Sequence, residues 1–214
     1  MEPYETTVPA EAVRQRVRWP LVAVVGGCAV ASLLVVALVA GGAYWYVSNV
    51  EEIPVTQADR EAMFDVADVA AAWDVVVDPD AAATTYTKWR YPDGTLWLEF
   101  VGEHETDAEY VWVYSSLDVE STSADAASLY HITALEPSEF ETERDEGFTW
   151  GDRSRFRHLL DDDGARVGWS LLAKRGKKVI EIIVTGLVFD PADDPLHFVA
   201  PFLERMAAHE PTAE

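Results

Sequence analysis

The sequence contains very little cysteine and few basic residues. Cys28 is the single cysteine, so no disulfide can form within the chain, whereas small exported domains of eukaryotes usually depend on disulfides. Lysine and arginine together number 16 against 38 acidic residues, which gives a formal net charge of −22. Nucleic acid would be repelled by such a chain, and we therefore expect no nucleic-acid partner.

Motifs that hold cofactors, metals or catalytic nucleophiles are also missing. The sequence has no GxGxxG or GxxxxGK[ST] loop for phosphates and no GxSxG turn. The five histidines have no HxxxH spacing, which argues against zinc. The acids that alternate between Glu103 and Glu109 lack the central glycine of a calcium-binding loop. We therefore expect a non-catalytic protein with no cofactor and no metal.

Charge of either sign is absent from residues 19–50, which are mostly apolar. Because about 20 apolar residues allow a helix to cross a bilayer, this run predicts one transmembrane helix. Basic residues precede it and Glu51 and Glu52 follow it, which predicts a cytoplasmic N-terminus. The topology-determining residues are Arg14, Arg16 and Arg18, and the aromatic residues expected at the membrane interfaces are Trp19, Tyr44, Trp45 and Tyr46.

Two other interpretations of this run remain open. A cleaved signal peptide normally has an apolar region of about 7–15 residues, which is much shorter than this one. Cys28 follows Val25-Gly26-Gly27, a faint likeness to a bacterial lipidation site, but the residues after it are apolar rather than polar. With neither a disulfide nor an Asn-x-Ser/Thr site, the chain is predicted to lie in a bacterial inner membrane, with a periplasmic or extracellular C-terminal domain.

Small residues recur at four-residue spacing within the predicted span. Ala23, Gly27 and Ala31 share one face, and Ala37 and Gly41 repeat the spacing nearby. Such residues let a second helix approach closely, although alanine and glycine are common in all spans. The expected partners are therefore the lipid bilayer and other integral membrane proteins, and a homo-oligomer is compatible with the same face.

The rest of the chain predicts one globular domain. We expect a cytoplasmic tail at 1–18, the span with its flanks at 19–50, a linker at 51–58, an extracytoplasmic α+β domain at 59–208 and a tail at 209–214. The whole net charge falls after the span, because three acids and three arginines before it cancel. Six tryptophans in this part indicate a packed core and not a disordered acidic tail.

Helical and strand patterns in this domain predict an antiparallel sheet of about six to seven strands packed with helices. A capping box at Thr56-Gln-Ala-Asp59 should begin a helix, and further helices are expected at 123–135 and 194–208. The turn Pro92-Asp93-Gly94 would place Trp89 opposite Trp97.

Two further turns set the register of the last three strands. A turn at Asp163-Gly164 would place Phe156 opposite Leu171, and a turn at Arg175-Gly176 would place Leu171 opposite Ile180. Both registers bring apolar residues to the same face of the sheet, which favours a three-stranded meander.

Basic residues gather in this last third of the domain. Arg153, Arg155 and Arg157 alternate along one predicted strand, and Lys174, Arg175, Lys177 and Lys178 surround the following turn. These seven residues form a candidate docking patch for an acidic partner. The alternative is that carboxylates of the domain itself neutralise them.

Together these features favour a membrane-anchored, non-catalytic accessory, assembly or scaffolding subunit of a larger membrane complex. The first alternative is an extracytoplasmic module that binds or senses a small molecule or peptide, which predicts a pocket lined by several of Trp89, Trp97, Trp112 and Tyr114. The second alternative is a membrane-anchored hydrolase, which requires His131 or His158 beside a carboxylate in an open cleft.

Overall fold

The computed structural model describes residues 41–42, 44–73, 83–105, 110–136, 140–190 and 193–213. The chain divides into two compact units, Met1–Asn49 and Val50–Glu214. In the first unit, residues 41–42 and 44–48 are helical, and Tyr44 and Trp45 are 77% and 58% exposed. None of the helices among the described residues is long and apolar enough to cross a membrane. The predicted span lies largely outside the described residues, together with Arg14, Arg16, Arg18, Trp19, Ala23, Gly27, Ala31 and Ala37.

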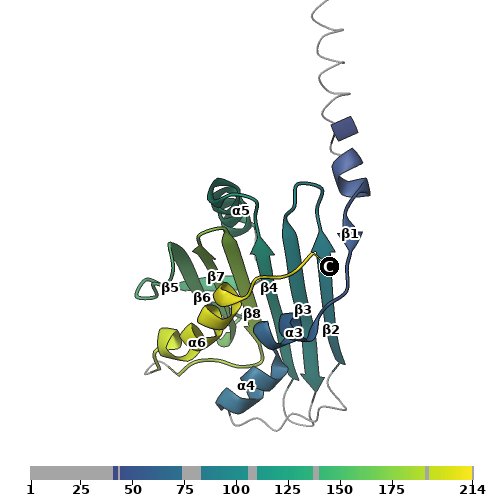
Figure 1. Cartoon of the computed structure of the whole chain (residues 1–214). Helices are drawn as coiled ribbons and strands as arrows, with labels where there is room; N and C mark the ends of the chain where they lie inside the picture. Colours follow the sequence, from purple (N-terminus) through teal and green to yellow (C-terminus); the bar gives the residue numbers. More distant parts are fainter. Residues whose placement is uncertain are drawn as a thin grey trace, which may run out of the picture. The chain divides into compact units, whose positions relative to one another are not determined.

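The second unit is built on one antiparallel sheet of eight strands in the order β1-β2-β3-β4-β8-β7-β6-β5 (Figure 1). One meander, β2 to β4, meets a second meander, β5 to β8, where β4 pairs with β8. The strands are β1 (Glu51–Glu52), β2 (Ala83–Arg90), β3 (Leu96–Glu105), β4 (Tyr110–Val119), β5 (Glu141–Asp145), β6 (Arg153–Leu160), β7 (Arg166–Arg175) and β8 (Lys178–Thr185).

The sheet is larger than the six to seven strands that the sequence predicts. The two edge strands were missed because neither has the sequence pattern of a strand. The edge strand β1 has only two residues, and the opposite edge strand β5 has the sequence ETERD. No apolar residue alternates along β5, so the usual period-two pattern of a half-buried strand is absent. Charged side chains are common on edge strands because they oppose pairing with other chains.

Helices cover both faces of this sheet, which confirms the predicted α+β class. The helices α3 (Gln57–Ala62), α4 (Val66–Trp73) and α6 (Pro195–Ala208) lie on one face, and α5 (Ser123–Leu135) lies on the other (Figure 1). The larger core, under α3, α4 and α6, contains Phe156 stacked on the fully buried Trp169 at 5.7 Å. The smaller core, under α5, joins Ala126 and Tyr130 to Leu172 and Val179.

The helices begin at or next to the capping residues that the sequence predicts. The capping box at Thr56 is present: the Thr56 hydroxyl accepts the Asp59 N–H, and the Asp59 carboxylate accepts the Thr56 N–H at 2.8 Å. Helix α5 is capped by Thr122 rather than by Ser123, because the Thr122 hydroxyl accepts the Asp125 N–H. Pro195 occupies the first turn of α6, after the N-cap Asp194.

The predicted strand pairings are confirmed in two hairpins and wrong by two residues in the third. Trp89 pairs with Trp97, and Phe156 pairs with Leu171. The last hairpin turns at Gly176 and Lys177 instead of Arg175 and Gly176, so Leu171 pairs with Ile182. Because side chains alternate with period two, this shift leaves every side chain on its predicted face.

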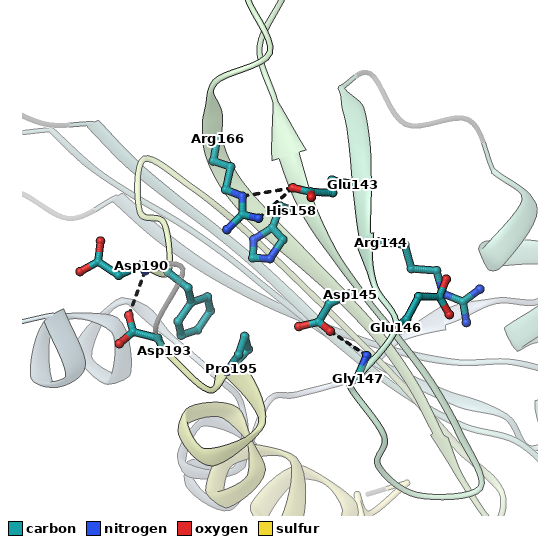
Figure 2. Close-up of a pocket in the computed structure, with 11 residues that line it drawn as sticks. Glu143, Arg144, Asp145, Glu146, Gly147, His158, Arg166, Asp190, Asp193 and Pro195 are labelled. Carbon is teal, nitrogen blue, oxygen red and sulfur yellow. Dashed lines mark hydrogen bonds and ion pairs between the residues drawn. The ribbon is translucent and has the colours of Figure 1, made fainter.

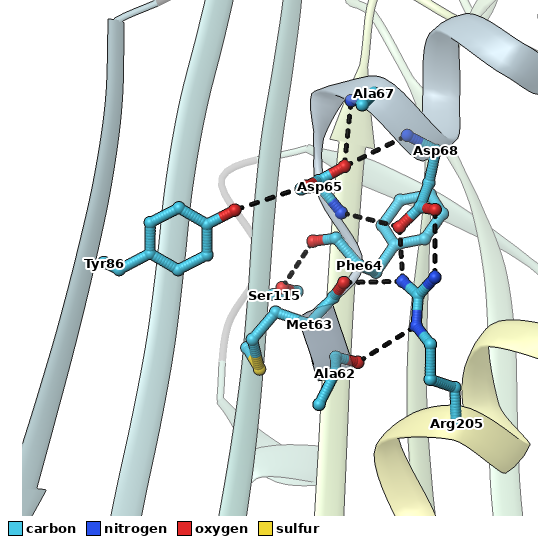
Figure 3. Close-up of polar contacts among 9 residues, drawn as sticks. All are labelled: Ala62, Met63, Phe64, Asp65, Ala67, Asp68, Tyr86, Ser115 and Arg205. Atoms are coloured by element: carbon cyan, nitrogen blue, oxygen red, sulfur yellow. Dashed lines mark hydrogen bonds and ion pairs between the residues drawn. The ribbon is translucent and has the colours of Figure 1, made fainter. Parts of the chain in front are cut away.

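Arg205 fastens α6 to the segment between α3 and α4 (Figure 3). Its guanidinium donates to both carboxylate oxygens of Asp68 and to the carbonyls of Met63 (2.6 Å) and Ala62 (3.3 Å). From the sheet, the Ser115 hydroxyl donates to the Phe64 carbonyl at 2.7 Å. These bonds satisfy backbone groups that the break between α3 and α4 would otherwise leave without partners.

Candidate functional site

The face of the sheet that carries α5 also carries a row of aromatic rings from β2, β3 and β4. Trp89 and Trp97 form a pair with ring centroids 4.7 Å apart. Trp112 and Tyr114 stack at 6.1 Å with an interplanar angle of 12°. All four rings are half-buried, since α5 packs over β7 and β8 rather than over these strands. This face is therefore neither a fully packed core nor an ordinary polar surface.

A cavity of about 510 Å³ opens on this face. Its floor comes from β4, β8, β7 and β6, and its walls come from the C-terminal end of α5 and from Phe140. The volume falls within the range of roughly 300–1,000 Å³ that small-molecule sites occupy. The lining residues are Tyr110, Trp112, Thr133, Glu136, Phe140, Arg157, Leu159, Ser170, Glu181, Ile183 and Thr185.

Two ionisable side chains from the floor give the cavity its chemistry. Burial raises the pKa of the Glu181 carboxyl to about 7, and the nearby Glu136 adds to the effect. Burial also lowers the pKa of the Arg157 guanidinium, as do the neighbouring Arg155 and Arg144. An arginine nevertheless stays charged at every physiological pH, whereas Glu181 is close to half protonated at neutrality. The cavity thus combines a permanent positive charge at Arg157, the carboxyl group of Glu181, which can be neutral, and the exposed carboxyl group of Glu136.

A second acid with a raised pKa lies on the same face, beyond the cavity lining. Burial raises the pKa of Asp118 to about 8, and the carboxylates of Glu120 and Glu181 raise it further. Asp118 sits in β4 opposite Trp97 and Val179. Perturbed acids beside aromatic rings are a common property of binding sites, although buried structural groups are perturbed as well.

The predicted pocket and the observed cavity coincide only in part. Of the four rings expected to line a pocket, Trp112 does so, while Trp89, Trp97 and Tyr114 lie on the same face outside the lining. Glu181, Tyr110 and Phe140 were not anticipated. Glu181 left a signal in the sequence, because it is one acid inside the apolar run Val-Ile-Glu-Ile-Ile-Val. No comparable sequence pattern marks Phe140.

The seven residues of the candidate docking patch do not act as one surface. Lys174 pairs with Asp152 at 2.9 Å, Arg175 pairs with Glu204, and Lys178 pairs with Glu210 at 2.6 Å. Arg155 donates to the Ala134 carbonyl at 2.6 Å, and Arg153 contacts His131 at 2.5 Å. Docking through this patch stays a prediction, but most of its charge already has a partner within the domain.

A second cavity, of about 430 Å³, lies between β5, β6 and the start of α6 (Figure 2). It is lined by polar groups that bond to one another: Arg166 pairs with Glu143 at 2.8 Å, and Asp190 N–H donates to Asp193 at 2.9 Å. Among the described residues, no group of three or more His, Cys, Asp or Glu side chains could hold a metal ion.

His158 lines this second cavity, and burial together with Arg166 lowers the pKa of its imidazole. In the described part of the chain its Nδ1 has no hydrogen-bond partner. His131 contacts Arg153, not a carboxylate. His209 lies 2.8 Å from the carboxylate of Asp59, which is a buried residue of α3. His158 shares this cavity with Glu143 and Asp145, and the hydrolase alternative stays a prediction.

No protein-family model matches the chain, and neither does any curated protein. Among solved structures, the extracellular domain of PknH from Mycobacterium tuberculosis is similar to it, with a TM-score of 0.44 and 9% sequence identity. The similarity covers 73% of this chain and 99% of the PknH domain. A likeness of this degree carries no argument about function.

Proposed function

We propose that residues 50–214 form a module that binds a small molecule in the cavity lined by Trp112, Arg157 and Glu181. The observation that carries this proposal is the cavity itself, which combines apolar walls with a few polar groups on a rigid sheet. Sites for small ligands are usually of this kind: mostly apolar, with a few placed polar groups that fix orientation.

The cavity parts suit different portions of a ligand. Trp112, Leu159 and Ile183 offer apolar surface, and the hydroxyls of Thr133, Ser170 and Thr185 offer hydrogen bonds. Tyr110 and Phe140 are 49% and 37% exposed, and they stand at the rim where a ligand would cover them. Covering such rings removes apolar area from water and favours binding by about 25 cal/mol per Å² before the costs of association.

A cavity-filling substitution tests this function. We expect Ser170→Trp to fill the floor, and Thr85→Trp is the matched control, since Thr85 is exposed on β2 outside the lining. The full chain in phosphatidylcholine nanodiscs is titrated with a mixture of fluorinated aromatic fragments, and binding is followed by fluorine NMR. Empty nanodiscs give the contribution of the lipid.

Wild type and Thr85→Trp should bind the same fragments, and Ser170→Trp should bind none of them. The proposal fails if wild type binds no fragment, or if the fragments it binds are retained by Ser170→Trp. Circular dichroism of each variant verifies that the sheet is intact.

We further propose that the predicted span holds this module at the outer surface of a membrane. This is supported by the charge-free run at 19–50 and by the exposure of Tyr44 and Trp45 on the described helix. Resistance to alkaline extraction, and digestion of the C-terminal domain by protease added outside intact cells, would be the expected results. Docking to a larger membrane complex remains the second role, and co-purification from native membranes in mild detergent tests it.

A further inference from the structure

Arg157 is set apart from the other arginines in the described part of the chain. Arg90, Arg144, Arg153, Arg155, Arg166, Arg175 and Arg205 each have a hydrogen bond or an ion pair, and Arg60 lies over the ring of Tyr86. Arg157 is half-buried in the cavity floor, and no hydrogen bond, ion pair or ring contact within that part of the chain involves it. A desolvated guanidinium with no anionic partner is unfavourable.

The carboxylates that share the cavity do not supply that partner. In the sheet Arg157 pairs with Ser170, and Ser170 pairs with Ile183. Glu181 precedes Ile183 by two residues on β8 and pairs with Leu172, which pairs with Arg155. It therefore lies two strands from Arg157, roughly 10 Å across the sheet at about 4.8 Å per strand, and is displaced along the strand as well. Burial and Glu136 also favour the protonated form of Glu181. Glu136, the other carboxylate of the lining, is exposed at the end of α5, and no ion pair among the described residues joins it to Arg157. Arg157 is therefore a cationic group of the cavity floor that neither carboxylate pairs with directly.

The positive charge of Arg157 is reinforced by its own strand. Arg155 precedes it on the same face, and Arg144 lies on the neighbouring β5 opposite Arg157. The carbonyl at the end of α5 that could attract a cation, that of Ala134, is already bonded to Arg155. An anionic group placed at Arg157 would receive charge-assisted hydrogen bonds in a partly desolvated place, where they are strongest.

Resting on the proposed function, we infer that the ligand is a small amphipathic carboxylate. Its carboxylate binds Arg157, and its apolar body lies against Trp112 and Ile183. A protonated Glu181 can donate a hydrogen bond to the same ligand, and the hydroxyl of Ser170 lies between the two polar groups.

Three probes of one shape and different charge test the ligand class. These are para-trifluoromethylbenzoate, its neutral benzamide and the cationic benzylamine, each titrated against the full chain in phosphatidylcholine nanodiscs by fluorine NMR. We expect the benzoate to bind about 10- to 100-fold more tightly than the other two, since a hydrogen bond to a charged group contributes that much discrimination. Arg157→Gln should abolish the difference.

Arg153→Gln is the matched control, because Arg153 lies on the same strand and face but outside the cavity lining. It should keep the preference for benzoate. Equal binding of all three probes, or a preference that survives Arg157→Gln, overturns the carboxylate ligand while leaving the cavity as a binding site. If none of the probes or fragments binds, the proposed function itself fails.

Discussion

The Nζ of Lys88 lies 2.9 Å from the Oδ2 of Asp59, and both side chains are almost completely buried. Burial by itself would raise the pKa of Asp59, but hydrogen bonds from Lys88, Thr56 and His209 outweigh it and hold the pKa at about 2. The pair joins β2 to α3 inside the domain, so each charge depends on the other for its stability.

Removing the lysine should therefore be costly. We expect Lys88→Met to lower the free energy of unfolding by about 3–5 kcal/mol, because it leaves a buried carboxylate without its cation. Urea denaturation at neutral pH measures the change. The double variant Lys88→Met with Asp59→Asn should be less destabilised than Lys88→Met alone, since neither charge is then stranded. A double variant as unstable as the single one would mean that lost packing, not charge, explains the effect.

Arg205 should also matter more than other arginines of the surface. Lysine cannot reproduce its fork of bonds to Asp68 and two carbonyls, so we expect Arg205→Lys to destabilise the domain by about 2–4 kcal/mol. The control is Arg90→Gln, which removes the exposed pair with Glu51 and should cost less than about 1 kcal/mol. Comparable urea midpoints for the two variants would contradict this assignment.

Gly186 and Gly94 have the same positive φ of 88° but different surroundings. A Cβ on Gly94 would have no atom within 4 Å, whereas one on Gly186 would lie 1.9 Å from the carbonyl oxygen of Tyr110. Gly94→Ala should cost about 1–2 kcal/mol through backbone strain alone. Gly186→Ala should cost clearly more and shift β4 at the rim of the cavity. Chemical denaturation compares them, and equal losses would show that the contact can relax.

Binding of the benzoate probe should weaken as the pH rises through about 7. Glu181 loses its proton over this range, because its pKa is raised to about 7, and the new charge repels an anionic ligand. The other charged groups around it are Glu136, the C-cap of α5, Arg155 and Arg157 from β6, and Asp118 from β4. Glu181→Gln should remove most of the pH dependence between pH 6 and about 8, as measured by fluorine NMR titration. If the affinity for benzoate depends on pH as strongly after this substitution as before it, Glu181 is excluded as the group responsible.

Much of the fold could be predicted from local signals. Pro92-Asp93-Gly94 and the alternation of apolar residues placed Trp89 opposite Trp97 and Phe156 opposite Leu171, since turn chemistry and burial both act over short distances. The last hairpin was predicted two residues out of register. A shift of two residues keeps each apolar side chain on the same face, so the alternation of apolar residues cannot distinguish the two registers. The strand β5 was not predicted because an exposed edge strand needs no apolar residues and so has no period-two apolar pattern.

The candidate site was predictable only in part. Trp112 was expected at a pocket because aromatic rings on a strand face favour one. Arg157 was predicted as one of seven residues of a docking patch for an acidic partner, and not as part of a pocket. Among the described residues Arg157 has no partner while Arg155 bonds to Ala134, and this difference depends on where α5 ends above the sheet. A relationship of this kind joins residues far apart in the sequence, and no local pattern encodes it.

We expect the pairing of β4 with β8 to be a late step that the chain must complete to reach its native state. Ser115 pairs with Ile182 there, so two meanders that can form from nearby residues must meet across a long separation in sequence. Pairing of this kind is slow because the loop must close before the contacts form. Until then the apolar strand Val-Ile-Glu-Ile-Ile-Val presents an open edge to other chains, and such edges promote aggregation. We therefore expect aggregation to compete most strongly with folding before β4 and β8 have paired.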